Sequence, residues 1–154
     1  MNRILIILSI ALSFSCFSQH YETAIGIKAG GHGGGFAGIN LKHFVSNKNA
    51  LEVTLGGSNR HIRADILYEW QNATGVAENL DWYIGIGGAA GSWSTSGGKH
   101  QRGLYILGSA VLGLDYTLPI VPINIAFDTG PYVGVINSKT FGWGGAFGIR
   151  YIIK

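Results

Sequence analysis

The sequence predicts an all-β fold: an eight-stranded antiparallel up-and-down transmembrane β-barrel. Three observations support this prediction. The 154-residue chain contains eight stretches in which apolar side chains alternate with polar or small ones, which is the period of a β-strand. Only 12% of the residues are charged, about half the usual share in a soluble domain. Seven of the eight acidic residues nevertheless share the parity opposite the apolar one, so we expect lipid outside the barrel and charges inside it.

The first 18 residues have the pattern of a secretory signal peptide. Arg3 supplies the positive charge, residues 4–14 form an apolar run, and Cys16 and Ser18 are the small residues before a cut at Gln19. The run is shorter than the about 20 apolar residues that a spanning helix needs. We therefore expect cleavage near Ser18/Gln19.

This cleavage leaves one domain, an outer-membrane β-barrel at 19–154, after a signal peptide at 1–18. Cys16 is the only cysteine, so the mature chain is expected to have no disulfide or thiol chemistry. The alternative is a lipoprotein whose Cys16 is acylated. Ser13 stands where such a signal has an aliphatic residue, and the alternative is disfavoured for that reason.

The remaining chain divides into eight expected strands, separated by clusters of glycine, asparagine, serine and proline. About 9–11 residues are enough for a tilted strand to cross a membrane. The expected strands are residues 21–29, 36–44, 49–57, 60–71, 80–92, 103–118, 121–135 and 141–153.

The alternation has the same sense in every segment. In the fourth, Ile62, Ile66 and Trp70 point one way while Arg63 and Glu69 point the other. The first three segments place lysine, glutamate, asparagine and threonine on the inward side, and the fifth places an aspartate there. In the last three, leucine, isoleucine, valine and aromatic residues alternate with small or polar ones.

The inward-facing positions of the expected strands include both acidic and basic residues. A charge away from water is tolerated only when it is paired and hydrogen-bonded, so we expect a structural network. Eight strands leave an interior just wide enough for side chains, which disfavours an open proton or cation path. The expected lumen residues are Glu22, Lys28, Lys42, Glu52, Arg63, Asp65, Glu69, Asp81, Asp115, Asp128 and Arg150.

Aromatic residues give a separate indication of the membrane boundary. If both termini are periplasmic, six tyrosines and tryptophans gather on the outward parity at that end, as in an interfacial girdle. Trp143 is the best candidate for the opposite girdle. The six are Tyr21, Tyr68, Trp70, Trp82, Tyr116 and Tyr151.

Other motifs carry little chemistry. The glycine runs 85–91 and 142–148 read GxGxxxG and do not open a helix after a strand, as phosphate binding requires; inward glycines let a narrow barrel close. His32, His61 and His100 have no metal-site spacing, although a metal site at a rim of loops is a disfavoured alternative. We expect no cofactor and no metal. The formal charge of +3 indicates no nucleic-acid partner.

The pattern of the whole expected mature chain resembles that of a family, the small eight-stranded outer-membrane barrels of the OmpX/OmpA transmembrane-domain type. Gly148, Tyr151 and Ile153 in the last strand are similar to the signal read by the outer-membrane assembly machinery, whereas Phe147 and Lys154 depart from it. The resemblance implies a monomer in the Gram-negative outer membrane, with lipid and that machinery as partners. It implies membrane integrity, surface interaction or no identified activity, and supplies no catalytic residue.

The expected function is therefore a non-enzymatic structural or surface-interaction role. One alternative is a secreted or periplasmic lipocalin-like barrel, which would need apolar residues inside and charges outside. Another is a lipid-modifying outer-membrane hydrolase, which would need a nucleophile, a base and an acid on one accessible face. His43 is outward, but every acid expected in a strand points inward, so no triad is predicted.

Overall fold

The computed structural model describes residues 21–33, 35–58, 61–95, 101–138 and 141–153. The expected signal peptide and its cleavage site lie outside this part of the chain. Among the described residues, no helix is long and apolar enough to cross a membrane. The strands are β1 (Thr23–Gly31), β2 (Phe36–Phe44), β3 (Asn49–Ser58), β4 (His61–Ala73), β5 (Leu80–Thr95), β6 (Gln101–Thr117), β7 (Ile123–Ile136) and β8 (Gly142–Ile153).

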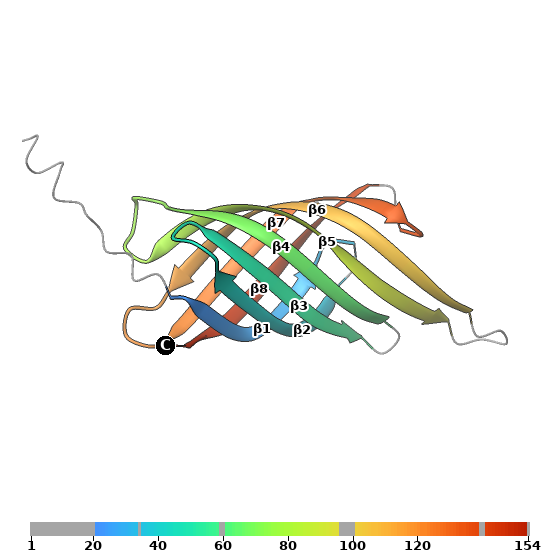
Figure 1. Ribbon diagram of the computed structural model, residues 1–154, viewed down its shortest axis with the longest axis horizontal. Coiled ribbons are helices and arrows are strands. Elements are labelled where there is room, and N and C mark those ends of the chain that lie inside the picture. The colour runs from blue at the N-terminus through green and yellow to red at the C-terminus, as the bar shows by residue number, and fades with distance from the viewer. Residues whose placement is uncertain (1–20, 34, 59–60, 96–100, 139–140, 154) are drawn as a thin grey trace, which may run out of the picture.

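These strands form one closed barrel, and every neighbouring pair is antiparallel (Figure 1). The strands pair in chain order, and β1 closes the sheet by pairing with β8. The predicted eight-stranded, antiparallel, up-and-down barrel is confirmed. Closure leaves no open sheet edge along the barrel wall.

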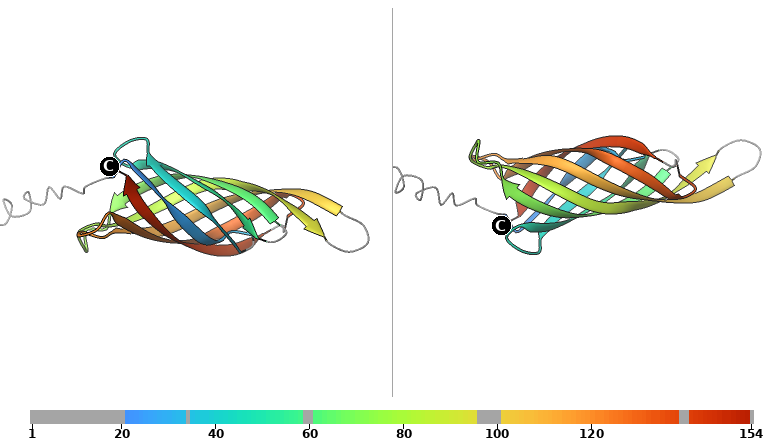
Figure 2. Two further views of the ribbon diagram at one scale, coloured as in Figure 1. Left: turned by 90° about the horizontal axis from the view of Figure 1, so that it is seen from below. Right: turned by 90° about the horizontal axis from the view of Figure 1, so that it is seen from above.

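The two ends of the barrel differ in their connections. We call the end that carries the C-terminus and the β2–β3, β4–β5 and β6–β7 turns the terminal end, and the opposite end the loop end (Figure 1). At the loop end the β5–β6 hairpin projects beyond the other strands (Figure 2). β5 continues to Thr95, three residues past the expected boundary, because Thr95 still pairs with Gln101 across the hairpin.

The inner and outer faces of the wall alternate as expected. On β1, Ile27 is 66% exposed whereas the next residue, Lys28, is 6% exposed. On β7, Phe127 is 54% exposed whereas Asp128 is fully buried. Large apolar side chains therefore cover the outside of the barrel, and charged ones lie within it.

Inward glycines make room for large side chains inside the narrow barrel. Three inward tyrosines each lie against a glycine that is their register partner on the neighbouring strand. A Cβ added at Gly113 would lie 2.2 Å from the ring of Tyr83. The other two pairs are Tyr105 with Gly91 and Tyr132 with Gly142.

The charged lumen as the candidate functional site

The centre of the lumen contains three cationic side chains from strands far apart in the sequence. Lys28 on β1 contacts Glu52 on β3 and lies 2.6 Å from Asp128 on β7. Lys42 on β2 lies 2.7 Å from Asp115 on β6. All five side chains are at most 6% exposed. The pairs therefore link strands that are not neighbours, and Lys42 and Asp115 join opposite walls of the barrel.

Arg150 on β8 joins these pairs into a cluster. Its guanidinium contacts Glu52 and lies 3.6 Å from Asp115. It also donates to the side-chain oxygen of Asn40, and to the side-chain oxygen of Asn124 at 2.9 Å. A buried guanidinium needs several acceptors to offset the loss of water, and four side chains supply them here.

Neutral groups extend the network toward the terminal end. The Lys42 ammonium donates to the Gln71 side-chain oxygen at 2.7 Å, and the Gln71 amide donates to Asp81 at 2.9 Å. Asp81 and Asp115 are cross-strand neighbours, and Gln71 and Lys42 supply the donors that these two carboxylates need. The Tyr83 hydroxyl donates to Asp128 at 3.1 Å.

All eight strands contribute to this one connected set of ion pairs and hydrogen bonds. Each strand supplies at least one buried polar side chain to it: Lys28 (β1), Lys42 (β2), Glu52 (β3), Glu69 (β4), Tyr83 (β5), Asp115 (β6), Asp128 (β7) and Arg150 (β8). The network therefore links the strands through side chains inside the barrel, in addition to the backbone hydrogen bonds between neighbouring strands.

A separate pair lies toward the loop end. Arg63 and Asp65 are both on the inward face of β4, 2.6 Å apart, and the Arg63 guanidinium stacks over the ring of Phe36 with its carbon 4.7 Å from the ring centroid. Arg63 is 3% exposed. Its charge is satisfied locally, without a partner from the central cluster.

Of the expected lumen residues, the structure places all four cations and six of the seven acids inside the barrel. Glu22 is the exception, because its side chain is exposed. The sequence interpretation missed Gln71 and Tyr83 as members of the network. Both stand on the inward parity of their strands, which was the available signal.

The assignment of Tyr21 to the exterior girdle is also wrong. Tyr21 is 8% exposed and packs edge-on against Phe44, with the ring centroids 5.2 Å apart. Its hydroxyl donates to Asp115 at 3.4 Å, and burial raises its pKa. The alternation of β1 begins only at Thr23, and Glu22 lies in a bend. Extending the strand parity back to residue 21 therefore reversed both side chains.

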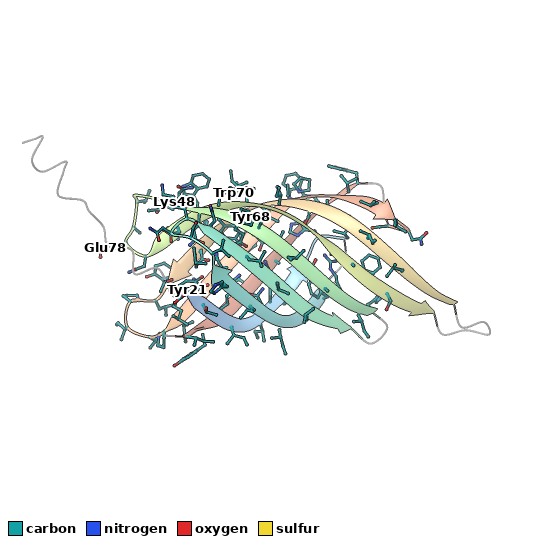
Figure 3. The ribbon with its side chains drawn as sticks, viewed as in Figure 1. Tyr21, Lys48, Tyr68, Trp70 and Glu78 are labelled. Carbon is teal, nitrogen blue, oxygen red and sulfur yellow. The ribbon has the colours of Figure 1, made fainter. Side chains whose placement is uncertain are left out.

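The other five aromatic residues of the expected girdle lie on the outside of their strands. Tyr68 and Trp70 contact each other edge to face at 5.0 Å on β4, near the end that carries Lys48 and Glu78 (Figure 3). Trp70, Tyr116 and Tyr151 are 41%, 38% and 58% exposed, and Trp82 is partly exposed.

Of the expected assembly signal, Gly148 faces the lumen, while Tyr151 and Ile153 face outward on β8.

The candidate histidines do not form a metal site in the described part of the chain. His32 is buried in the turn after β1, His61 is exposed at the start of β4, and His100 lies outside the described residues. Within the described ranges no group of three or more histidine, cysteine, aspartate or glutamate side chains could hold a metal ion.

Comparisons with known proteins agree on the fold. No family model matches the chain, and no curated protein does. The N-terminal β-barrel domain of Pseudomonas aeruginosa OprF is similar in structure, with a TM-score of 0.68 at 12% identity over 85% of this chain and 96% of that one. Neisserial surface protein A (NspA) has a TM-score of 0.54 at 13% identity, over 85% and 94%.

Both of these structures are eight-stranded outer-membrane barrels. The expected likeness in fold to such barrels is therefore confirmed.

Proposed function

We propose that this chain is an integral protein of a Gram-negative outer membrane, a non-enzymatic barrel with a packed polar lumen and a structural or surface-interaction role. The observation that carries the proposal is that the outer face of the barrel is apolar and the inner face is charged. Ile27, Ile39 and Val135 are at least 64% exposed on the outside, while the charges are buried within. A water-soluble barrel would have the opposite arrangement, because its exposed face would need charges.

The polar groups on the outer face support the same proposal. The indole N–H of Trp143 donates to the Thr129 hydroxyl at 2.7 Å, and that hydroxyl donates to the Gly144 carbonyl at 2.9 Å. The Thr23 hydroxyl and the His43 ring lie 2.9 Å apart. Hydrocarbon offers no hydrogen-bond partner, so a lipid-facing polar group has to be satisfied by its own chain.

The buried network favours a structural role over a pore. Lys28, Lys42 and Arg150 occupy the centre of the lumen and bind carboxylates on strands that are not their neighbours. Widening a water path would separate these pairs in a low-dielectric interior, which is costly. We infer a monomer whose partners are outer-membrane lipid and, during biogenesis, the assembly machinery.

Two other functions have weaker support. A lipocalin-like carrier needs an apolar interior, whereas this interior holds ten charged side chains in its described part. A lipid hydrolase needs a nucleophile, a base and an acid together. Thr23 and His43 supply a hydroxyl and an imidazole on the outer face, but no described carboxylate pairs with His43. A hydrogen-bonded exterior pair explains their contact.

The test is refolding of the chain in phospholipid vesicles. We expect unboiled protein to migrate differently from boiled protein on an SDS gel, because a closed barrel opens only by global unfolding. The same preparation should show no sizeable single-channel conductance and no release of fatty acid from phospholipid. Identical gel mobilities would contradict the membrane barrel. Lipid hydrolysis lost in Thr23→Val would contradict the non-enzymatic role.

A further inference from the structure

The turn after β1 folds back into the mouth of the barrel at the loop end. His32 in this turn is only 5% exposed, although the neighbouring Gly33 and Gly35 are exposed. Its Nε2 atom is buried without a hydrogen-bond partner. It faces Oδ1 of Asp128 at 4.0 Å, and that oxygen also has no hydrogen-bond partner. Since 4.0 Å is too long for a hydrogen bond, burial of this imidazole gains no direct polar contact.

The space that His32 occupies depends on glycines. Gly30, Gly31 and Gly33 have φ angles of 111°, 119° and 91°, values that other residues rarely adopt. A Cβ added at Gly33 would lie 2.6 Å from Cδ2 of Leu107, and one added at Gly144 would lie 2.8 Å from the His32 Cα. The inserted turn is therefore fitted closely to the mouth.

Beneath this turn lies an apolar cluster formed by Ala89, Leu107 and Tyr132. The turn covers it, because Leu107 is 1% exposed and touches the position of Gly33. Burial of this cluster favours insertion of the turn at any pH. His32 is the residue of this turn that can change its charge with pH.

Charged groups on three strands act on the His32 ring. Asp128 on β7 lies 4.0 Å from it, and Lys28 on β1 and Arg63 and Asp65 on β4 also contribute to its electrostatic environment. Leu107 on β6 and Gly144 and Gly145 on β8 also lie against the turn. Burial lowers the pKa of His32 below its ordinary value of 6.5, and Lys28 and Arg63 act in the same direction, while Asp128 and Asp65 oppose them.

We propose that residues 31–33 form an acid-released plug: neutral His32 lies inserted in the loop-end mouth, and protonation of its ring drives the turn outward. The inserted imidazole binds a proton less tightly than a solvated one. The inserted state is therefore fully favoured above the ordinary imidazole pKa and is lost as the pH falls below it. Release uncovers Leu107 and one oxygen of Asp128, and leaves the central ion pairs in place.

The test is a nitroxide spin label on Gly35→Cys, a position where an added Cβ meets no atom within 4 Å. The background carries Cys16→Ser, so the label has a single thiol. The label is attached at neutral pH to refolded protein, and its mobility is read by electron paramagnetic resonance between about pH 7.5 and pH 5. We expect the mobile fraction of the spectrum to grow in acid relative to neutral pH, with a midpoint below about 6.5.

His32→Gln cannot be protonated in this range, and its spectrum should not change with pH. His61→Gln changes an exposed histidine of the same end and should keep the full acid response. Heat-shifted gel mobility at both pH values verifies that each barrel is folded; if His32→Gln does not fold, His32→Met replaces it. A parent spectrum that does not change with pH would overturn the plug, as would an equal acid response without His32. Both results leave the proposed membrane function intact, since that is judged by the gel shift.

Discussion

The inner and outer faces of the barrel wall obey different rules, and neighbouring residues on β8 show the contrast. Arg150 is 1% exposed and binds acids and amides from four other strands. Ile149 and Tyr151, on either side of it, are 41% and 58% exposed. The inner face depends on specific partners at fixed distances, whereas the outer face needs only apolar character. Substitutions should therefore be judged by partner inside and by polarity outside.

Removing the central guanidinium should have the largest effect. Arg150→Met leaves Glu52 and Asp115 in a lumen with too few cations, and we expect a loss of about 3 kcal/mol or more in the free energy of unfolding. The matched control is the outward neighbour, Ile149→Met, which changes shape but not polarity and should cost less than about 1.5 kcal/mol. Urea unfolding in vesicles measures both.

The double variant Arg150→Met/Glu52→Gln sharpens this test. Removing a negative charge together with the positive one should recover part of the loss, because fewer buried charges are left unpaired. If Arg150→Met alone costs no more than Ile149→Met, the lumen network does not stabilise the barrel.

The outer face should respond to charge according to depth. Leu112 on β6 and Ile120 in the β6–β7 turn are both exposed, at 56% and 93%. Leu112→Arg places a charge in the apolar belt and should cost about 2–4 kcal/mol, while Ile120→Arg lies beyond the strand ends and should cost at most about 1 kcal/mol. The measurement is again unfolding in vesicles. Equal costs would show that the belt does not meet hydrocarbon.

Two glycines, one on each face, differ in the space beside them. A Cβ added at Gly26 would lie 1.9 Å from the carbonyl oxygen of Ile149, whereas one added at Gly108 meets nothing closer than 3.9 Å. Gly26→Ala should therefore cost about 1–3 kcal/mol through overpacking, and Gly108→Ala should lie within about 0.5 kcal/mol of the parent. A comparison of unfolding midpoints is sufficient, and the reversed order would contradict the geometry.

The sequence predicted the outer face better than the inner one. Lipid imposes one requirement on every outward residue, so alternation alone identifies Ile27 or Phe127 as exterior. The partner of a lumen charge depends on how the closed sheet brings strands together. Lys42 meets Asp115, 73 residues away, and nothing in the spacing of the two residues indicates this.

Alternation also fails where strands end. Tyr21 and Glu22 precede β1, and the bend at Glu22 reverses their side chains. His32 follows the same strand, on the parity of Lys28, and is buried in a turn where Gly30, Gly31 and Gly33 have positive φ angles. Both residues lie beyond the regular strand, and the strand period gave the wrong direction for Tyr21.

Tyr21 allows the smallest and most specific comparison. Tyr21→Phe removes the hydroxyl that donates to Asp115 at 3.4 Å, and since this contact is long we expect a loss of only about 0.5–1 kcal/mol at neutral pH. Tyr151→Phe, on the outer face, is the control and should be nearly neutral.

Because burial raises the pKa of Tyr21 above its ordinary value of 10.0, the folded chain holds this proton after an unfolded one has released it. The stability that Tyr21 contributes is therefore present below pH 10.0 and declines above it. Unfolding measured from pH 8 to about pH 11 should show the parent losing its advantage over Tyr21→Phe only at the alkaline end. An advantage over Tyr21→Phe that stays unchanged up to about pH 11 would mean that the Tyr21 hydroxyl is as accessible to water as an exterior one.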